Sequence, residues 1–144
     1  MIYSNWFALS SASSKTTTTL YPGTLFETFA LRYTFAVQGA PSGVVNNGTL
    51  LMYFRPSPSD AVYPFPVGSY NGQVNMQLES FTSTTCTILL FRGPGSAAVS
   101  ELYDEDAASF RYVVIPGGTA AGGRSRTVDY GNYEQVISYY GIPR

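Results

Sequence analysis

The chain of 144 residues has no histidine, one cysteine and one lysine, and charged residues make up only 12% of it, against roughly 25% in an ordinary soluble domain. Without histidine, the commonest general base is missing, which excludes serine–histidine and cysteine–histidine nucleophile pairs. Zinc sites of the ordinary kind are excluded too. Cys86 has no partner for a disulfide and precedes the apolar run Ile88-Leu89-Leu90-Phe91. We therefore expect Cys86 to be a buried core side chain.

The charge balance gives no sign of a nucleic acid or membrane partner. The net charge is −1 and the isoelectric point about 5.2, and the arginines are scattered along the chain, so no basic patch is expected. No apolar run reaches the roughly 18 residues that a transmembrane helix needs, and the start of the chain has no basic flank typical of a signal peptide. We expect no cofactor and no enzymatic activity.

Aromatic and hydroxyl-bearing residues take the place of the missing charges, with 12 tyrosines, 9 phenylalanines and one tryptophan. The length predicts one domain, spanning residues 1–144. A chain of this size buries about 68–70% of its unfolded surface. Much of the aromatic and hydroxyl-bearing surface must therefore face a partner, and we expect that partner to be another protein.

Alternating apolar and polar residues predict β-strands over 25–37, 73–81 and 109–115. In the first of these, the odd positions from Phe29 to Val37 are expected to point inward, with Thr28, Arg32 and Thr34 outward. In the third strand, Phe110, Tyr112 and Val114 are expected on one face. Ser109 and Arg111 are expected on the other. Two further runs, 50–54 and 88–91, are apolar on both faces, which is typical of central strands covered on both sides.

Turn residues separate these runs and predict how they are joined. Asn46-Asn47-Gly48 is typical of a β-hairpin, and Pro116-Gly117-Gly118 is expected to end a strand. Short strands at this spacing predict an all-β fold, an antiparallel sandwich or a jelly-roll-like arrangement.

Three segments are expected to lie outside the regular strands. Residues 1–20, with a Ser/Thr-rich stretch, are predicted to form an N-terminal arm, and residues 55–70, which carry four prolines, an extended loop. A short helix is predicted over 131–141. Asn132 is its expected N-cap, with Gln135 at capping-box spacing and Gly141 at its end.

Two loops contain residue types that also occur in metal-binding or phosphate-binding sites. The acidic residues of 101–106 (Glu101, Asp104, Glu105 and Asp106) are predicted to form a solvated loop. A calcium site and an acidic contact for a partner's arginine are the alternatives. The glycine-rich stretch 117–123 lacks the Gly-Lys-Ser/Thr ending of a phosphate loop, so a flexible connector is predicted. Glu79, Glu101 and Glu134 show no spacing typical of a glycosidase carboxylate pair.

The candidate interface residues lie in these outlying segments, because tryptophan, tyrosine and arginine dominate interface hot spots. Trp6 and Phe7 are the sharpest candidates, although an edge strand that packs Trp6 into the chain's own core is an equal alternative. The remaining candidates are Tyr63, Phe65, Tyr70, Arg124, Arg126, Tyr130, Tyr133, Tyr139 and Tyr140.

The size, the all-β pattern, the arm-like terminus and the Ser/Thr/Gly-rich loops resemble the small cement (decoration) proteins of tailed-bacteriophage heads. This resemblance covers the whole chain and includes no diagnostic motif. It implies a homo-oligomer, often a trimer, that clamps junctions between major capsid proteins on the virion head and does no chemistry. A phage tail or baseplate component and a carbohydrate-binding module or adhesin are the alternatives.

Overall fold

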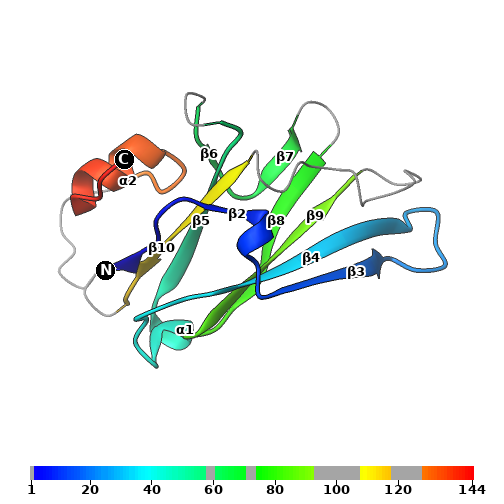
Figure 1. The fold of residues 1–144 in the computed structure, drawn as a ribbon, viewed down its shortest axis with the longest axis horizontal. Helices are drawn as coiled ribbons and strands as arrows, with labels where there is room; N and C mark the ends of the chain where they lie inside the picture. Colours follow the sequence, from blue (N-terminus) through cyan, green and yellow to red (C-terminus); the bar gives the residue numbers. More distant parts are fainter. Residues whose placement is uncertain (1, 58–60, 71–73, 93–107, 118–127) are drawn as a thin grey trace.

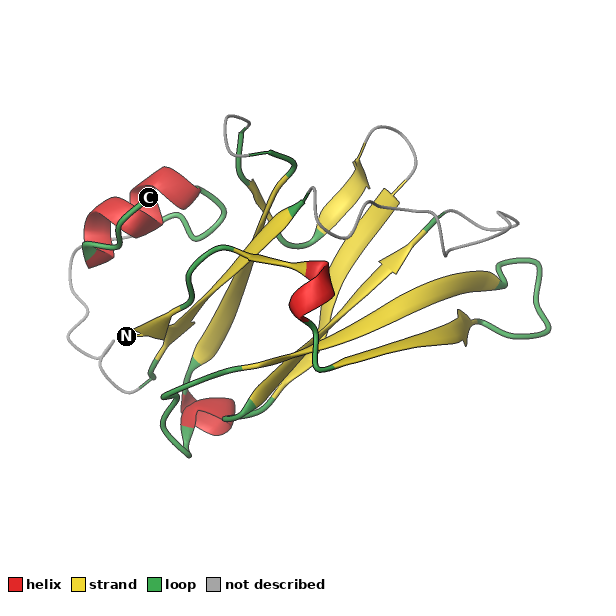
Figure 2. Cartoon of the chain, in the orientation of Figure 1, coloured by secondary structure: helices red, strands yellow, loops and turns green. Residues whose placement is uncertain are grey.

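Two antiparallel β-sheets and a C-terminal helix make up the fold, so the predicted all-β sandwich is confirmed. The computed structural model describes residues 2–57, 61–70, 74–92, 108–117 and 128–144 (Figures 1 and 2). The glycine-rich stretch after Gly117 and the acidic residues of 101–106 lie outside the described residues.

The first sheet has the strand order β1-β10-β5-β6, and β2 also pairs with β10. Its strands are β1 (Ile2–Tyr3), β2 (Phe7–Ala8), β5 (Thr49–Arg55), β6 (Tyr63–Pro64) and β10 (Ser109–Ile115). The second sheet has the order β3-β4-β9-β8-β7. Its strands are β3 (Ser14–Leu20), β4 (Thr28–Ala36), β7 (Val67–Tyr70), β8 (Val74–Phe81) and β9 (Thr85–Phe91). A 3-10 turn, η1 (Leu9–Ser11), connects β2 to β3 across the two sheets.

The main core lies between the two sheets and is built by the alternation of the strands. Leu31, Tyr33 and Phe35 from β4 meet Phe110 and other side chains of the opposite sheet there. Cys86 is fully buried in this core, and burial raises the pKa of its thiol to about 12, because a thiolate is poorly solvated in apolar surroundings. The thiol is therefore a packing group, as the sequence predicted.

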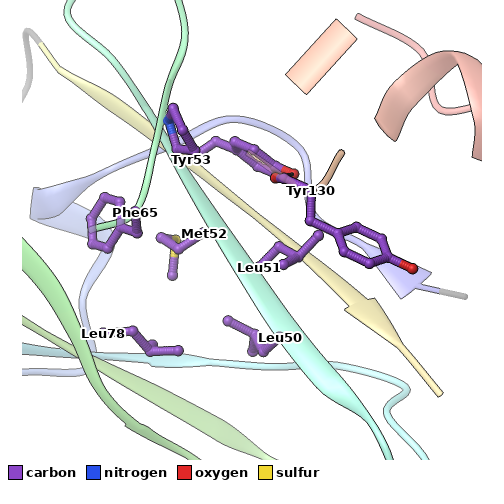
Figure 3. Close-up of a pocket in the computed structure, with 8 residues that line it drawn as sticks. Leu50, Leu51, Met52, Tyr53, Phe65, Leu78 and Tyr130 are labelled. Carbon is purple, nitrogen blue, oxygen red and sulfur yellow. Dashed lines mark hydrogen bonds between the residues drawn. The ribbon is translucent and has the colours of Figure 1, made fainter. Parts of the chain in front are cut away.

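A second core covers the outer face of the first sheet. Strand β5 presents Leu50 and Met52 to the main core, whereas Leu51 and Tyr53 point to the opposite side, toward the C-terminal helix (Figure 3). The helix α2 (Tyr133–Tyr140) packs there with Tyr133, Val136 and Ile137 against the sheet. The second apolar face that the sequence shows in 50–54 is thus covered by the chain's own helix.

The helix α2 lies within the predicted range 131–141 and has the two cap residues that the sequence predicts. The Asn132 side chain accepts a hydrogen bond from the Gln135 backbone N–H, as an N-cap does. Gly141 follows the last turn with φ 66°, a left-handed conformation that glycine adopts without steric cost.

Arg111 is buried, which corrects its expected place on an outer polar face. It is 2% exposed on β10, because α2 and the C-terminal residues cover this side of the strand. Its guanidinium donates to the Ser4 carbonyl at 2.8 Å, the Tyr133 hydroxyl at 2.7 Å and the Pro143 carbonyl at 2.7 Å. A single buried cation therefore ties both ends of the chain to the first sheet.

The predicted hairpin at Asn46-Asn47-Gly48 is wrong. A short helical turn, α1 (Val44–Asn47), lies there instead, because β4 and β5 belong to different sheets and a tight hairpin cannot join them. Val44 is buried in the main core. Gly48 is required by close packing, since a Cβ at this position would lie 2.6 Å from the Ile115 carbonyl oxygen.

The predicted inward face of residues 25–37 is wrong at its first position. Phe29 is 48% exposed and Thr28 is 5% exposed. Phe29 lies opposite Thr19 near the end of the β3–β4 pair, beyond the residues that meet the opposite sheet. Leu31, Tyr33, Phe35 and Val37 are buried as predicted.

The two segments expected as arms lie along sheet edges. In the N-terminal segment, β1 and β2 pair with β10, and β3 pairs with β4 along all seven of its residues. In the proline-rich segment, β6 pairs with β5 at the edge of the first sheet. Prolines are tolerated at such an edge because one side of the strand forms no ladder.

Candidate interaction surface

The largest exposed apolar side chains gather at the turn between β3 and β4. Leu25 is 94% exposed, Tyr21 68% and Phe26 65%, and Phe29 at the base of the turn is 48% exposed. We call these four residues the apolar tip. The turn lies at one end of the molecule's long axis, opposite the end that carries α2 (Figure 1). Neighbouring exposed apolar side chains of this kind make the turn a candidate interaction surface.

Hydrogen bonds within the turn hold the tip in shape. The Gly23 N–H donates to a Glu27 carboxylate oxygen at 2.7 Å, and the Thr24 hydroxyl donates to the Tyr21 carbonyl at 2.8 Å. The Phe26 N–H donates to the Thr24 hydroxyl at 3.2 Å. These bonds restrict the conformations of the turn, and a restricted loop loses less conformational entropy on binding than a flexible one.

Tyr21 adopts a backbone conformation that is costly for a side chain of its size. Its φ of 52° lies in the left-handed region, which non-glycine residues rarely occupy and which costs on the order of 1–3 kcal/mol. Glycine would occupy the same position without this cost. The tyrosine ring at this position is 68% exposed, so packing within the fold does not account for the cost.

Trp6 and Phe7, the sharpest sequence candidates, pack against the chain's own cores. The Trp6 ring lies 5.8 Å from the Tyr133 ring, and the Arg55 guanidinium lies 4.1 Å above it. Phe7 packs 4.7 Å from Phe35 in the main core. This is the alternative arrangement that the sequence left open for Trp6, and it gives neither ring a large exposed face.

Of the candidates in the proline-rich segment, Tyr63 and Phe65 lie at β6 and beside β5, apart from the apolar tip. Tyr63 is 38% exposed, with its ring 6.0 Å from that of Phe54. Phe65 packs against Phe110 and lines a small cavity of about 80 Å³ beside β5 (Figure 3). The side chain of Tyr70 and the residues Arg124 and Arg126 lie outside the described part of the chain.

The four C-terminal tyrosines divide between the second core and the surface. Tyr133 is buried, whereas Tyr130 and Tyr139 are 44% and 48% exposed. Tyr140 is partly buried with its hydroxyl 3.4 Å from that of Tyr130, and burial, aided by this contact, raises its pKa. Burial also raises the pKa of Tyr53, whose hydroxyl donates to the Tyr130 carbonyl. This cluster holds α2 in place and leaves two rings at the surface.

An uncharged groove of about 390 Å³ lies between the N-terminal segment and the end of β4. The exposed residues Tyr3, Asn5 and Gln38 line it together with Phe35 and Tyr112, whose side chains are buried. Its volume is within the range of small-molecule sites. The mix of rings and neutral hydrogen-bonding groups suits an uncharged polar ligand.

Within the described residues, no group of three or more acidic, cysteine or histidine side chains is placed to hold a metal ion. No helix in that part of the chain is both long and apolar enough to cross a membrane. Comparisons of the chain with protein-family models, curated proteins and solved structures find no match. The apolar tip therefore has to be interpreted from its own geometry.

The sequence carried a signal for the apolar tip that the strand pattern concealed. Pro22-Gly23 is a turn dipeptide, and it places Leu25 and Phe26 in a loop rather than at the start of a strand. The alternation from Phe29 onward made the whole of 25–37 resemble one continuous strand. The turn dipeptide therefore indicates that Leu25 and Phe26 lie outside the strand, where no core residues are expected to cover them.

Proposed function

We propose that this chain is a non-enzymatic subunit of a larger protein assembly, and specifically a capsid cement (decoration) protein that bridges major capsid proteins on a virion head. The observation that carries the proposal is the apolar tip, a braced turn that projects Leu25 and Phe26 into solvent at one end of the molecule. The low charge of the chain also supports the proposal. An isolated copy has few charges, so electrostatic repulsion between copies does little to prevent association.

The tip provides enough apolar surface to anchor the chain on a partner. Burying a leucine or phenylalanine side chain contributes about 1.5–3 kcal/mol. Leu25 and Phe26 together therefore supply about 3–6 kcal/mol, which corresponds to a factor of about 10²–10⁴ in affinity. A few anchors of this kind usually dominate an interface, while the polar rim around them excludes water.

The double variant L25S/F26S is expected to lose attachment to the particle. Capsid particles made without the chain, from the virus that encodes it, are mixed with purified chain and pelleted. We expect the wild-type chain to pellet in fixed proportion to the capsid protein, and the variant to bind at least about 100-fold more weakly because both anchors are gone. Purified tails in the same assay distinguish a head protein from a tail or baseplate component.

The matched control is Val45→Ser, which removes another exposed apolar side chain, 48% exposed on α1. It is expected to pellet like the wild type. Near-UV circular dichroism shows that all variants keep the fold. A wild-type chain that stays in the supernatant, or an L25S/F26S variant that pellets equally well, would overturn the proposal.

Carbohydrate binding is a second candidate, favoured by the uncharged groove beside Tyr3. Aromatic faces and amide groups recognise neutral sugars by stacking and hydrogen bonding. On a glycan array, this function predicts specific signals that Gln38→Ala reduces at least about tenfold, since unpaired sugar hydroxyls cost over 1 kcal/mol each, and that L25S/F26S leaves unchanged. The absence of a specific signal from every glycan on the array would exclude carbohydrate binding.

A further inference from the structure

The edges of the two sheets differ sharply in how they are protected. In the first sheet, β1, β2 and β6 are two residues long, and β6 ends in Pro64. In the second sheet, β7 has four residues and a register shift against β8. Short strands, prolines and irregular pairing are the ordinary means of keeping an edge from joining another chain.

Strand β3 lacks these three protections, although it carries one lysine, Lys15, a residue type that also protects edges. Its seven residues pair with β4 in unbroken register, without a proline or bulge, and no strand of the described residues pairs with its other side. Residues Ser14 to Thr17 are exposed. A regular, exposed edge strand of this length is a template for a further strand, and threonine favours the strand conformation.

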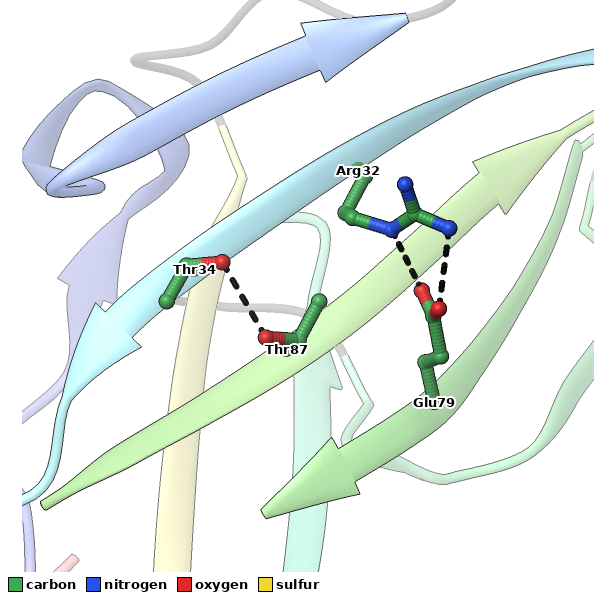
Figure 4. A network of polar contacts seen from close by, with 4 residues as sticks. All are labelled: Arg32, Thr34, Glu79 and Thr87. Carbon is green, nitrogen blue, oxygen red and sulfur yellow. Dashed lines mark hydrogen bonds and ion pairs between the residues drawn. The ribbon is translucent and has the colours of Figure 1, made fainter. Parts of the chain in front are cut away.

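The charges around this edge do not oppose a neighbouring strand. Lys15 is the one charged residue of β3, and its ammonium lies over the Tyr33 ring of β4, 5.7 Å from the centroid. Arg32, opposite Thr16 on β4, forms two hydrogen bonds with the Glu79 carboxylate at 2.7 and 2.9 Å (Figure 4). Beside this ion pair, the Thr34 and Thr87 hydroxyls lie 3.0 Å apart, so the face next to the edge is neutral and polar.

We propose that β3 of one copy pairs antiparallel with β3 of a second copy, with the two-fold axis at Thr17. This register is self-complementary, as a two-fold interface requires. It places Thr17 opposite Thr17, Thr16 opposite Thr18, and Ser14 opposite Leu20. The lone cation Lys15 lies opposite Thr19 and not opposite itself. Cross-strand threonine pairs are favourable, and the two sheets become one continuous sheet.

This pairing rests on the proposed assembly function and extends it. The apolar tip follows β3 in the chain, so antiparallel pairing places the tips of the two copies at opposite ends of the dimer. Two tips on one rigid body bind two partner subunits at once, and the second contact is then intramolecular. A dimer with one apolar tip at each end can therefore bridge two neighbouring partner subunits.

Two variants with the same number of substitutions test the register. In T16K/T18K, each lysine faces a lysine of the other copy, whereas in T16E/T18K each glutamate faces a lysine. Cross-strand charge pairs contribute about 0.2–1 kcal/mol each. With two such pairs, we expect T16K/T18K to raise the dimer dissociation constant about 2- to 30-fold. T16E/T18K is expected to keep or lower it in low-salt buffer.

Sedimentation velocity over a concentration series, up to about 100 μM, measures the dissociation constant, since a micromolar constant gives mostly dimer there. Gln77→Lys, exposed on the inner strand β8, is the matched control and is expected to leave it unchanged. A wild-type chain that is monomeric throughout, or equal constants for T16K/T18K and T16E/T18K, would overturn the pairing. The particle assay separates this result from the proposed function, because a monomeric T16K/T18K variant with an intact tip still pellets.

Discussion

Replacing Arg111 with alanine is expected to lower the free energy of unfolding by about 3–5 kcal/mol, because it breaks a hydrogen-bond network in which a buried charged donor makes three bonds. The substitution removes three hydrogen bonds, and it leaves the Tyr133 hydroxyl and the carbonyls of Ser4 and Pro143 without their donor. The Tyr133 hydroxyl belongs to a buried residue, and a buried group that loses its partner costs more than the bond itself contributed. Equilibrium denaturation in urea, followed by tyrosine and tryptophan fluorescence, measures the change.

The matched control is Arg32→Ala, which removes an arginine from an exposed ion pair with Glu79. It is expected to have a small effect, because exposed ion pairs contribute about 0–1 kcal/mol. Hydrogen exchange provides a second readout, since Arg111→Ala should increase exchange in α2 and Arg32→Ala should not. Equal stability losses in the two variants would contradict the role given to Arg111.

Replacing Gly117 with alanine is expected to cost about 3 kcal/mol or more, at the upper end of overpacking effects. A Cβ at this position would lie 0.9 Å from the Asn47 carbonyl oxygen and 2.1 Å from its carbonyl carbon. These are backbone atoms, so no side-chain rotation relieves the overlap. The end of β10 or the turn α1 must move, and both border the main core through Val114 and Val44. The thermal midpoint of unfolding is the measurement.

Gly68→Ala is the control for this prediction, because a Cβ on Gly68 meets no heavy atom within 4 Å. It is expected to change stability by less than about 1 kcal/mol. Since domains of this size are stable by roughly 5–15 kcal/mol in total, the two glycines should be readily distinguished. A Gly117→Ala protein as stable as the Gly68→Ala protein would show that α1 does not pack on the end of β10 as described.

The parts of the fold that depend on local patterns could be predicted from the sequence. Alternation located β8 and β10, and the caps at Asn132 and Gly141 located α2 to within two residues of the predicted 131–141. These features are set by interactions within a few residues of one another. The apolar character of both faces of β5 correctly indicated a second cover, although the sequence could not identify α2 as that cover.

The parts that depend on long-range packing could not be predicted. Arg111 resembles any outward arginine in an alternating strand, and only the C-terminal residues folding over β10 make it buried. Asn46-Asn47-Gly48 has the composition of a hairpin, but the placement of β4 and β5 in different sheets excludes one. Trp6 was a predicted interface residue because it is a tryptophan near a terminus, whereas the exposed large apolar residues of the described chain include Leu25 and Phe26, in a turn.

Hydroxyl-radical footprinting tests the central claim most directly, by comparing the free chain with the chain in its particle. The oxidation of Tyr21, Leu25 and Phe26 is measured by mass spectrometry, with exposed Tyr139 on α2 as the internal reference. We predict that oxidation of Tyr21, Leu25 and Phe26 falls at least about fivefold in the particle, because buried interface anchors are shielded from solvent. Oxidation of Tyr139 is expected to fall less. Tip residues oxidised as strongly in the particle as in the free chain would contradict it.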